Sequence, residues 1–299
     1  MSILVAADFD AADWAVWWPA LQAALPGETL CRAADRPAPA DIDIAIVANP
    51  PAGSLQALPR LQLVQSLWAG VDKLLRDPTL PAEVPLARMV DPAMNAAMAE
   101  TALWAALALQ RGFFGYAAQQ RAGVWRQHEQ RRADETRVAV LGLGQMGQAV
   151  AARLAQQGFI VDGWRTRSGP VDTVLREADI VISLLPLTPA TSGFFDRARF
   201  AQMRRGASFV NLARGAQVVE ADLISALDDG QLSHAVLDVF ATEPLPAGHA
   251  FWGHPKVTVL PHVAAQTDPR SAAQVVAANI RALRSGQPLQ HVVDRQRGY

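Results

Sequence analysis

The sequence predicts an α/β protein built from two units, a small α/β unit and a second unit with a parallel sheet covered by helices on both faces. The chain has 299 residues, whereas single domains typically hold about 100–200 residues. Short apolar runs alternate with helical stretches along its length, which is typical of parallel sheets buried on both faces. A glycine-rich turn, residues 142–147, directly follows one of these runs near the middle of the chain. This turn belongs to a second α/β pattern that is stronger than the first.

The composition excludes several classes of protein. The chain is 51% hydrophobic and 18% charged, so it can bury a sizeable core and is not intrinsically disordered. Its net charge of −1, without a basic stripe, argues against nucleic-acid binding. The single cysteine, Cys31, excludes an internal disulfide and a multi-cysteine zinc site, and the histidines show no metal-like spacing. No apolar run approaches the roughly 18 residues of a membrane span. We therefore expect a cytoplasmic protein without a metal, membrane or nucleic-acid partner.

The first unit is predicted from strands at residues 3–7, 42–47 and 61–66. A helical stretch with Trp14, Trp17 and Trp18 follows the first strand, and these tryptophans are expected to pack. The third strand leads into the loop Trp68-Ala69-Gly70-Val71-Asp72. Strands and helical segments alternate, which favours a small α/β unit.

The second unit follows a long alanine-rich helix that runs from Pro92 to about Gln110 and a polar, arginine-rich stretch at residues 119–137. A final helix at about residues 269–285 comes after this unit is complete, so it could return to the first unit. The strands expected in the second unit are residues 137–141, 159–161, 180–184, 208–211, 234–238 and 257–260.

The glycine-rich turn has the G-x-G-x-x-G spacing of a dinucleotide-binding fingerprint between a strand and a helix. Gly142 allows the tight turn, Gly144 lets the backbone approach a pyrophosphate, and Gly147 lets the helix pack closely on the strand. The free N–H groups at the start of the helix then attract the phosphates. The competing interpretation is a glycine-rich turn in an α/β domain that binds no dinucleotide.

Cofactor preference is predicted from the end of the next strand. An NAD-specific site has a carboxylate about 20 residues after the first glycine, where it binds the ribose 2′-hydroxyl. Here Trp164-Arg165-Thr166-Arg167-Ser168 occupies that place, and Asp162 is expected to belong to the strand. The basic cluster favours a 2′-phosphate, so NADP(H) is preferred and NAD(H) is the alternative. The competing interpretation is a solvated arginine-rich loop.

Three further motifs follow later strands, at the sheet edge where open α/β sheets bind their ligands. They contain Arg214 in Asn-Leu-Ala-Arg-Gly, Asp238 and Glu243 in Asp-Val-Phe-Ala-Thr-Glu-Pro, and His262 in Pro-His-Val-Ala-Ala. An arginine fork suits a carboxylate, and an imidazole suits proton transfer near neutral pH. Each motif alone is ordinary, because a single histidine, arginine or glutamate after a strand is more often structural or solvated.

Together, in this order after the glycine-rich turn, the motifs closely resemble the D-isomer-specific 2-hydroxyacid dehydrogenase family. The resemblance covers nearly the whole chain and is strongest from Val138 to Thr267. Within the family the chain is most similar to the glyoxylate/hydroxypyruvate reductase branch, A type. The segments that support this are Trp164, residues 184–189 and residues 292–295. Arg165 and Thr166 stand where that branch usually has a serine–arginine pair, which leaves open whether Arg165 or Arg167 meets the phosphate.

The resemblance implies two doubly wound parallel-sheet domains. A Rossmann cofactor domain, residues 98–267, is inserted in a smaller flavodoxin-like substrate domain, residues 1–97 and 268–299. It also implies a site in the cleft between them and a homodimer that pairs through the cofactor domains. Phe113, Phe114 and Tyr116 are the candidate interface residues.

The resemblance implies NADPH-dependent reduction of small 2-keto acids, such as glyoxylate and hydroxypyruvate. His262 is the expected general acid, Glu243 orients it, and Arg214 binds the substrate carboxylate. Trp68, Ala69, Gly70 and Val71 are expected to bind the substrate together with Arg214 and His262, although Trp68 also fits a plain core residue. Asp238 is assigned to the nicotinamide carboxamide. The residues expected to bind the cofactor are Gly142, Leu143, Gly144, Gln145, Met146, Gly147, Trp164, Arg165, Thr166, Arg167, Ser168, Leu185, Pro186 and Asp238.

Two alternatives stay open. One is a dehydrogenase of the same family that acts on a larger 2-hydroxy acid. The other is a dinucleotide-sensing regulatory protein, which is disfavoured because Arg214, Glu243 and His262 are all present.

The arginine cluster yields a first prediction. Hydrogen bonds to charged groups contribute roughly 1.5–3 kcal/mol each, so one arginine–phosphate contact favours NADPH by about 10–100-fold. The double change Arg165→Ala and Arg167→Ala should raise the KM for NADPH and leave that for NADH nearly unchanged. The preference should also weaken as ionic strength rises. Equal or better kcat/KM with NADH in the wild-type protein would contradict the phosphate-site interpretation.

Overall fold

The computed structural model describes residues 1–166 and 168–299, so the expected contact of Arg167 with a phosphate lies outside the described residues. The chain forms two compact units: the first comprises Met1–Ala93 and Thr267–Tyr299, and the second Met94–Gln266. The expected boundary at residue 97 thus falls slightly earlier. The reason is that the helix starting at Pro92 packs into the core of the second unit through residues such as Met98.

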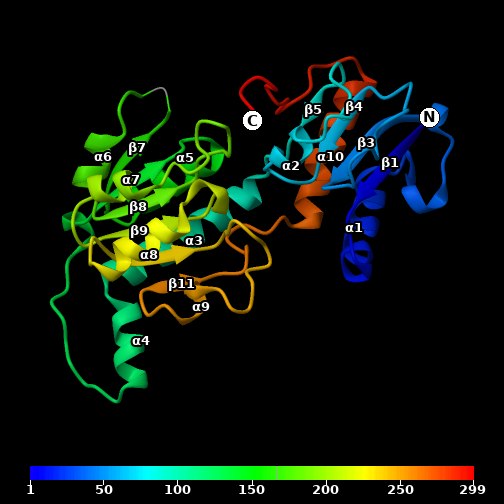
Figure 1. Ribbon diagram of the computed structural model, residues 1–299. Coiled ribbons are helices and arrows are strands. Elements are labelled where there is room, and N and C mark those ends of the chain that lie inside the picture. The colour runs from blue at the N-terminus through cyan, green and yellow to red at the C-terminus, as the bar shows by residue number, and fades with distance from the viewer. Residues whose placement is uncertain (167) are drawn as a thin grey trace. The chain divides into compact units, whose positions relative to one another are not determined.

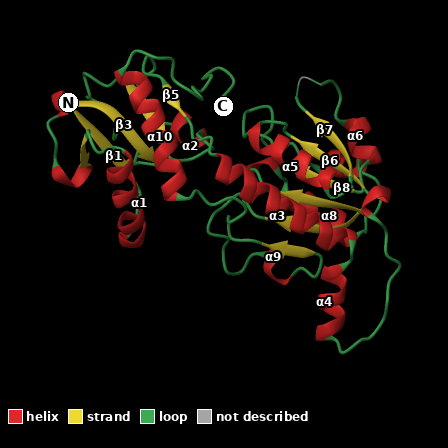
Figure 2. Cartoon of the chain, turned by 180° about the vertical axis from the view of Figure 1, so that it is seen from behind, coloured by secondary structure: helices red, strands yellow, loops and turns green. Residues whose placement is uncertain are grey.

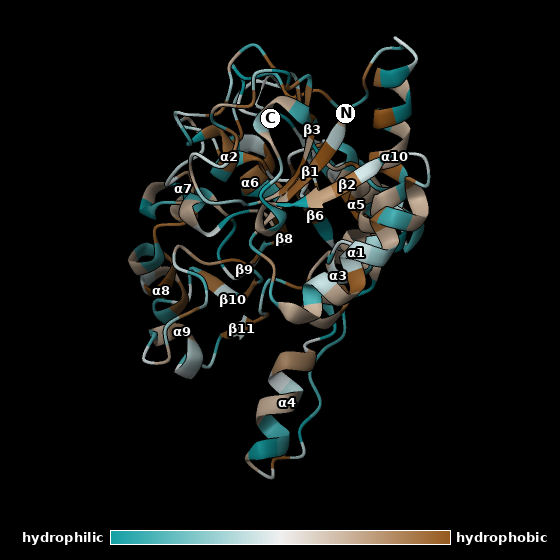
Figure 3. Ribbon diagram, turned by 90° about the vertical axis from the view of Figure 1, so that its right-hand side faces the viewer, coloured by the Kyte–Doolittle hydropathy of each residue, from teal (hydrophilic) through white to brown (hydrophobic). Residues whose placement is uncertain are grey.

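The first unit holds a five-stranded parallel sheet with the order β2-β1-β3-β4-β5 (Figure 1). This is the flavodoxin-like order, which confirms the expected fold. The strand β1 is coloured as hydrophobic in Figure 3. The elements of this unit are β1 (Ser2–Ala7), α1 (Ala11–Ala24), β2 (Thr29–Arg32), β3 (Ile42–Ala48), β4 (Leu63–Ser66), α2 (Asp72–Leu75), β5 (Leu86–Ala87) and α10 (Pro269–Arg284).

Helix α10 belongs to the first unit, as the sequence suggested (Figure 2). Its start is well defined, because the Asp268 side chain accepts a hydrogen bond from the Arg270 N–H and Pro269 occupies the first turn. The helix contacts α1 and covers β4, where the Asn279 amide donates to the side-chain oxygen of Gln65 at 2.7 Å. Both amide side chains are buried, so this bond satisfies polar groups inside the core.

The second unit holds a six-stranded parallel sheet with the order β11-β10-β9-β8-β6-β7. Strand β6 lies between β7 and β8, so the winding reverses there, and such a switch point is where open sheets bind ligands. The elements are α3 (Pro92–Gln110), α4 (Phe113–Arg121), β6 (Arg137–Leu141), α5 (Gln145–Gln156), β7 (Ile160–Trp164), α6 (Asp172–Glu177), β8 (Ile180–Ser183), α7 (Arg197–Gln202), β9 (Ala207–Asn211), α8 (Glu220–Asp228), β10 (Leu232–Leu237), α9 (Ala250–Gly253) and β11 (Val257–Val259).

Alternate residues of β6 belong to two different hydrophobic clusters, one on each face of the second sheet. Val138 and Val140 of β6 pack with residues of α3 and α5, whereas Ala139 and Leu141 pack with residues of α6, α7 and α8. Side chains point to opposite faces along a strand, so a sheet covered on both faces needs apolar residues at every position. This explains why the strands read as continuous apolar runs. No helix in the described part of the chain is both long and apolar enough to cross a membrane.

The stretch after α3 forms an arm that the sequence did not predict in this form. Helix α4 occupies part of it, and residues 121–132 return with every side chain exposed (Figure 1). At the base of the arm, the Phe114 ring stacks on His234 with ring centroids 4.4 Å apart. Burial lowers the pKa of His234 to about 4, so Phe114 packs on a neutral ring. Further along the arm, Trp125 is 96% exposed.

A charge pair between an exposed arginine and a buried carboxylate ties the last helix to the first unit. The Arg284 guanidinium on α10 contacts Asp43, whose side chain is fully buried on β3, and donates to both carboxylate oxygens of Glu28 at 2.9 and 2.8 Å. Removing one partner of such a pair leaves an uncompensated charge inside the protein, which costs about 3–5 kcal/mol.

We therefore expect Arg284→Met to lower the free energy of unfolding by about 3–5 kcal/mol in urea titrations. The control is Arg76→Met, which removes an exposed pair with Asp72 at 3.4 Å and should cost less than about 1 kcal/mol. A similar small loss for both variants would show that the Arg284 pair does not stabilise this unit.

Candidate active site

The glycine-rich turn joins β6 to α5, and two of its glycines are required by close backbone contacts. Gly142 has φ +101°, and a Cβ there would lie 2.5 Å from the Leu184 carbonyl oxygen. A Cβ on Gly147 would lie 2.0 Å from the carbonyl oxygen of Gly142. Gly144 is different, because a Cβ at that position would meet no atom within 4 Å. The space beside Gly144 is therefore open toward solvent, as a site for an approaching phosphate requires.

Helix α5 begins at Gln145 with Gly144 as its N-cap, and no side chain caps its first turn. Gly144 and Gln145 are exposed, whereas Leu143 and Met146 pack partly against the core. The first N–H groups of a helix lack partners within the helix and carry a partial positive charge. This end of α5 therefore fits the pyrophosphate of a dinucleotide.

Strand β7 ends at Trp164, whose indole is buried and donates to the Gly169 carbonyl at 3.0 Å. The Trp164 side chain therefore belongs to the core, and its expected contact with the cofactor stays a prediction. Arg165, Thr166 and Ser168 lie in an exposed turn after the strand, closed by the Ser168 N–H donating to Arg165.

Asp162 lies within β7, as predicted. Its carboxylate pairs with Arg137 at 2.7 Å, and that arginine is on the neighbouring strand β6. The turn after β7 contains no other carboxylate among its described residues. The position at which NAD-specific sites have a carboxylate is therefore basic here, and a basic position suits the 2′-phosphate of NADP(H).

The loop after β8 is held by two residues that the sequence analysis missed. The Gln217 amide donates to the carbonyls of Leu185 at 2.9 Å and Pro186 at 3.1 Å, and the Thr191 hydroxyl donates to Pro186 at 2.6 Å. Gln217 and Thr191 are both buried. They fix the loop that was expected to lie against the cofactor. No local pattern signals Gln217, because its main-chain partners are more than 30 residues away in the sequence, whereas Thr191 bonds within its own loop.

His262 and Glu243 form the acid–base pair of the site. The Nδ1 atom of His262 lies 2.8 Å from Glu243 Oε2, and the Phe240 N–H donates to the other carboxylate oxygen at 2.9 Å. The hydrogen bond to Glu243 raises the pKa of His262 above the ordinary histidine value, against the opposing effect of burial. Burial opposes ionisation of Glu243, but its hydrogen bonds to His262 and Phe240 leave its pKa below the ordinary value. Half of the His262 side chain, 52%, is exposed, so its ring is accessible to a substrate.

Arg214 completes this group. It lies in the loop after β9. Its positive charge partly opposes the rise in the pKa of His262 and adds to the lowering of the pKa of Glu243. The loop passes very close to its neighbour, since a Cβ on Gly215 would lie 1.8 Å from the carbonyl carbon of Phe240. Only a glycine fits at position 215, so Gly215 allows the loop that carries Arg214 to pass this close to Phe240. A glycine directly after Arg214 was the feature of the sequence that could have indicated this close approach.

Asp238 has a structural task that the sequence did not indicate. It is 2% exposed, and its two carboxylate oxygens accept the N–H groups of Val263 at 2.7 Å and Ala264 at 3.0 Å. Its carbonyl also accepts the N–H of His262, whose φ is +55°. Asp238 therefore holds the loop in the conformation that presents His262. Its expected contact with a nicotinamide carboxamide stays a prediction.

The expected substrate loop lies at the carboxyl end of β4 in the first unit. The Trp68 N–H donates to the Ser66 hydroxyl at 3.0 Å, and the Met89 N–H donates to the Trp68 carbonyl at 3.1 Å. Trp68, Ala69 and Gly70 are partly exposed, whereas Val71 is buried.

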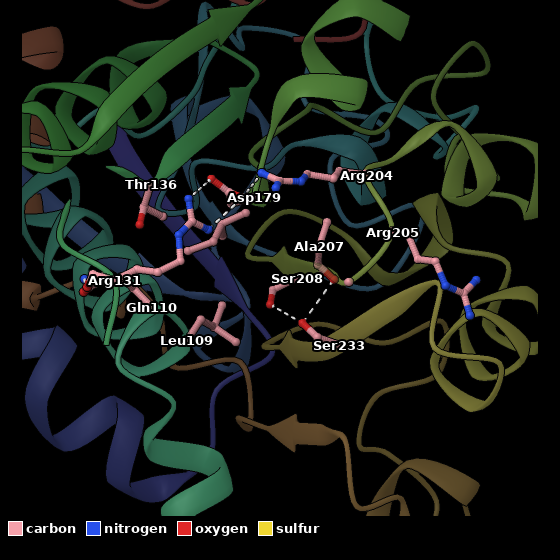
Figure 4. Close-up of a pocket in the computed structure, with 12 residues that line it drawn as sticks. Leu109, Gln110, Arg131, Thr136, Asp179, Arg204, Arg205, Ala207, Ser208 and Ser233 are labelled. Atoms are coloured by element: carbon pink, nitrogen blue, oxygen red, sulfur yellow. Dashed lines mark hydrogen bonds and ion pairs between the residues drawn. The ribbon is translucent and has the colours of Figure 1, made fainter. Parts of the chain in front are cut away.

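A pocket also occurs at the opposite, amino-terminal edge of the second sheet (Figure 4). There the Asp179 carboxylate accepts from Arg131 at 2.9 Å and from Arg204 at 2.6 Å. Two arginines thus satisfy the acid that faces this pocket, and the acid–base pair lies at the other edge. Among the described residues, no cluster of three or more histidine, cysteine, aspartate or glutamate side chains could hold a metal ion.

The fold and the site together define a class. A glycine-rich phosphate turn, an imidazole–carboxylate pair and an arginine stand at the carboxyl ends of strands in one doubly wound sheet, which is the arrangement of a dinucleotide-dependent oxidoreductase.

Comparison with known proteins identifies the family. Residues 103–264 match the model of the D-isomer specific 2-hydroxyacid dehydrogenase NAD binding domain. Glyoxylate/hydroxypyruvate reductase A of Serratia proteamaculans is 42% identical over 282 residues, which is 89% of each chain. The chain belongs to the D-isomer specific 2-hydroxyacid dehydrogenase family.

Solved structures agree with this assignment. A D-isomer specific 2-hydroxyacid dehydrogenase from Xanthobacter autotrophicus, in complex with NADPH and MES, has a TM-score of 0.93 and 38% identity, covering 100% of this chain and 99% of that one. An NADPH-dependent glyoxylate/hydroxypyruvate reductase from Sinorhizobium meliloti, in complex with NADP and sulfate, has a TM-score of 0.92 and 36% identity, covering 100% of both chains. The expected family and its branch are thereby confirmed.

The pKa of His262 provides a test of the pair. Glu243→Gln should lower it, because a neutral amide stabilises the imidazolium less than a carboxylate does. The folded state of the wild-type protein raises this pKa, so the associated stability is present at low pH and is lost as pH rises through the raised value. NMR titration of the histidine ring measures the shift directly.

The control for this titration is Asp228→Asn, which alters the separate pair of His254 and Asp228 at 3.2 Å. It should leave the pKa of His262 unchanged. An identical titration of His262 in the wild-type protein and in Glu243→Gln would contradict the assigned pair.

Proposed function

We propose that this protein catalyses the NADPH-dependent reduction of small 2-keto acids, such as glyoxylate and hydroxypyruvate, to 2-hydroxy acids. The observation that carries the proposal is the 2.8 Å contact of His262 with Glu243 beside Arg214, at the same sheet edge as the phosphate turn. The names of the relatives from Serratia proteamaculans and Sinorhizobium meliloti support the choice of substrates.

His262 supplies the proton. Glu243 engages Nδ1, so Nε2 is the nitrogen that faces the keto oxygen and donates to it. The raised pKa favours the protonated ring, which is the form that a general acid needs. As the proton leaves, Glu243 keeps the ring in one orientation. When bound, the reduced nicotinamide supplies the hydride that completes the reduction.

Arg214 binds the substrate carboxylate, because a guanidinium presents two parallel N–H donors to the two oxygens. The main-chain N–H groups of Gly70 and Val71 contribute to the same carboxylate, and Trp68 and Ala69 shape the space for the remainder of the acceptor. These roles rest on the family resemblance and on the position of the loop at the carboxyl end of β4.

The fit of the cofactor rests on the open space beside Gly144 and the uncapped start of α5. Leu143 to Gly147 would hold the pyrophosphate, and the turn with Arg165, Thr166 and Ser168 would hold the 2′-phosphate. Leu185 and Pro186 would lie against the cofactor, and Asp238 would bind its carboxamide. NADP(H) is the preferred cofactor, and NAD(H) is used less efficiently.

An assay of 2-keto acids of increasing size with NADPH and NADH tests this proposal. Efficient turnover of glyoxylate and hydroxypyruvate with NADPH is the expected result. Turnover restricted to larger acids would favour another dehydrogenase of the family, and binding of NADPH without any turnover would favour a regulatory protein. A cytoplasmic location stays a prediction.

The general acid yields a direct prediction. His262→Ala should lower kcat by about 10²–10⁴-fold, which is the usual contribution of general acid–base catalysis. NADPH binding, measured by fluorescence, should be retained. The control His254→Gln changes a histidine paired with Asp228 and should keep kcat close to that of the wild-type protein. Near wild-type kcat in His262→Ala would rule out the role.

We further propose that a second copy of this chain covers the arm of residues 113–132, giving a homodimer that pairs through the cofactor domains. Support comes from exposed apolar side chains on the arm, with Phe113 54% and Trp125 96% exposed. Phe114 and Tyr116 are less suited than expected. Phe114 stacks on His234, and the Tyr116 hydroxyl accepts the His128 N–H at 3.0 Å.

Sedimentation at micromolar concentration should therefore show a dimer. The double change Phe113→Ser and Trp125→Ser should shift the population toward monomer, because burial of these side chains would be lost. Trp252→Ser is the control, since Trp252 is 54% exposed and lies outside the arm. A wild-type protein that sediments only as monomer would refute the dimer.

A further inference from the structure

Five aromatic side chains of the first unit form a connected group, which we term the aromatic cluster. Phe9 follows β1 and Trp68 follows β4, so both lie at the carboxyl edge of the parallel sheet. Trp14, Trp17 and Trp18 are on helix α1. The ring centroids of Phe9 and Trp68 are 6.3 Å apart, and those of Trp17 and Trp68 are 5.7 Å apart with nearly perpendicular planes. Phe9 also stacks on Trp17 at 5.7 Å. The three rings therefore brace one another.

The other end of the cluster is also held. Trp14 contacts Phe9 at 5.3 Å and Trp18 at 6.0 Å. The Arg32 guanidinium lies over both of these indoles, 4.6 Å from Trp14 and 4.2 Å from Trp18. Cation–π contacts of this kind contribute about 0.5–1 kcal/mol at exposed sites. The contacts thus run without a break from Arg32 at the surface to Trp68.

The main chain of Trp68 is fixed as well. Its N–H donates to the Ser66 hydroxyl at 3.0 Å, and its carbonyl accepts both that hydroxyl at 3.1 Å and the Met89 N–H at 3.1 Å. Trp68 is only partly buried, while Trp17 behind it is 3% exposed. Trp68 therefore has one side packed against the cluster and another side open.

We propose that Phe9 and Trp17 are positioning residues that make Trp68 a rigid wall against the side chain of the acceptor. The wall restricts the site to 2-keto acids whose side chain is hydrogen, methyl or hydroxymethyl. This inference rests on the proposed function, in which the loop from Trp68 to Val71 binds the acceptor. It adds that selection by size depends on residues of β1 and α1 that do not touch the substrate.

The size limit follows from packing. The Trp68 indole is packed against Phe9 and Trp17, so it cannot move away from the acceptor without losing these contacts. A larger acceptor would therefore clash with the indole. One methylene too many in such a pocket reduces kcat/KM by about 10–200-fold. An indole without support would instead rotate away and admit the larger side chain.

The test compares kcat/KM for 2-ketohexanoate with kcat/KM for glyoxylate, a quotient that we term the size ratio. Phe9→Leu removes the ring that braces Trp68 and should raise the size ratio at least about tenfold, chiefly through a lower KM for 2-ketohexanoate. The kcat for glyoxylate should change little. Phe9→Tyr keeps the ring and should retain the wild-type ratio.

Trp18→Leu is the matched control. It removes a ring of the same cluster from the same helix, and Trp18 has ring contacts with Trp14 and Arg32 but none with Trp68 in the described chain. It should lower the melting temperature as Phe9→Leu does, without raising the size ratio. Phe9→Met serves as a second variant should Phe9→Leu fail to fold.

A double-mutant cycle separates positioning from general loosening. Phe9→Leu added to Trp68→Ala should cause no further change in the size ratio, because Phe9 acts only through Trp68. The proposal would be contradicted if Phe9→Leu changed the size ratio equally in the wild-type and Trp68→Ala backgrounds. It would also be contradicted if Phe9→Leu and Trp18→Leu changed the size ratio equally. Absence of any 2-keto acid reduction by the wild-type protein would instead overturn the proposed function.

Discussion

The carboxylate of Asp238 is the group on which the geometry of the candidate site depends. It is buried at the end of β10, and it accepts two successive main-chain N–H groups from the loop after β11. Burial raises the pKa of Asp238, although both N–H groups oppose that rise. A buried acid is costly unless its oxygens are hydrogen-bonded, so the loop cannot move away without leaving the charge unsatisfied. The positive φ of His262 is maintained by this constraint.

Close contacts between neighbouring strand ends impose a second constraint. The loops after β6, β8, β9 and β10 approach one another closely enough that Gly142 and Gly215 have no room for a Cβ. Parallel strands make this crowding possible, because all their carboxyl ends meet at one edge. The site is thus assembled from short segments far apart in the sequence, each fixed by the main chain of the next. Its precision comes from the sheet and not from any single loop.

Most strands of both sheets and the glycine-rich turn were predictable because continuous apolar runs and glycine spacing are local signals. The strands β2 and β5 were not, since β2 is only partly buried and β5 has only two residues, of which Ala87 also pairs with Val292 of the C-terminal segment. Arg214, Glu243 and His262 were assigned through resemblance to a family, and their catalytic roles stay predictions. Gln217 and the structural task of Asp238 were missed, because both depend on distant main-chain partners that leave no pattern in the sequence.

The side chain of Trp164 shows the same limit. Its position after the second strand of the cofactor domain is a motif of the family branch, but the sequence does not reveal that the indole turns into the core and bonds to Gly169. The turn that follows could be recognised as basic, whereas the pairing of Asp162 with Arg137 had to be seen in the structure. At such a site the sequence therefore predicts which residue types are present, whereas the directions of their side chains are known only from the structure.

The return of helix α10 to the first unit has a consequence for how the chain is made. Residues 267–299 are synthesised after the inserted domain, yet they supply the helix that covers β4 and the arginine that pairs with Asp43. The 173 residues from Met94 to Gln266 must be synthesised in between. At about 5–20 residues per second, the N-terminal sheet waits about 10–35 s for the helix that covers β4 and packs against α1. The inserted domain can complete its own core during that interval, before all segments of the first domain have been synthesised.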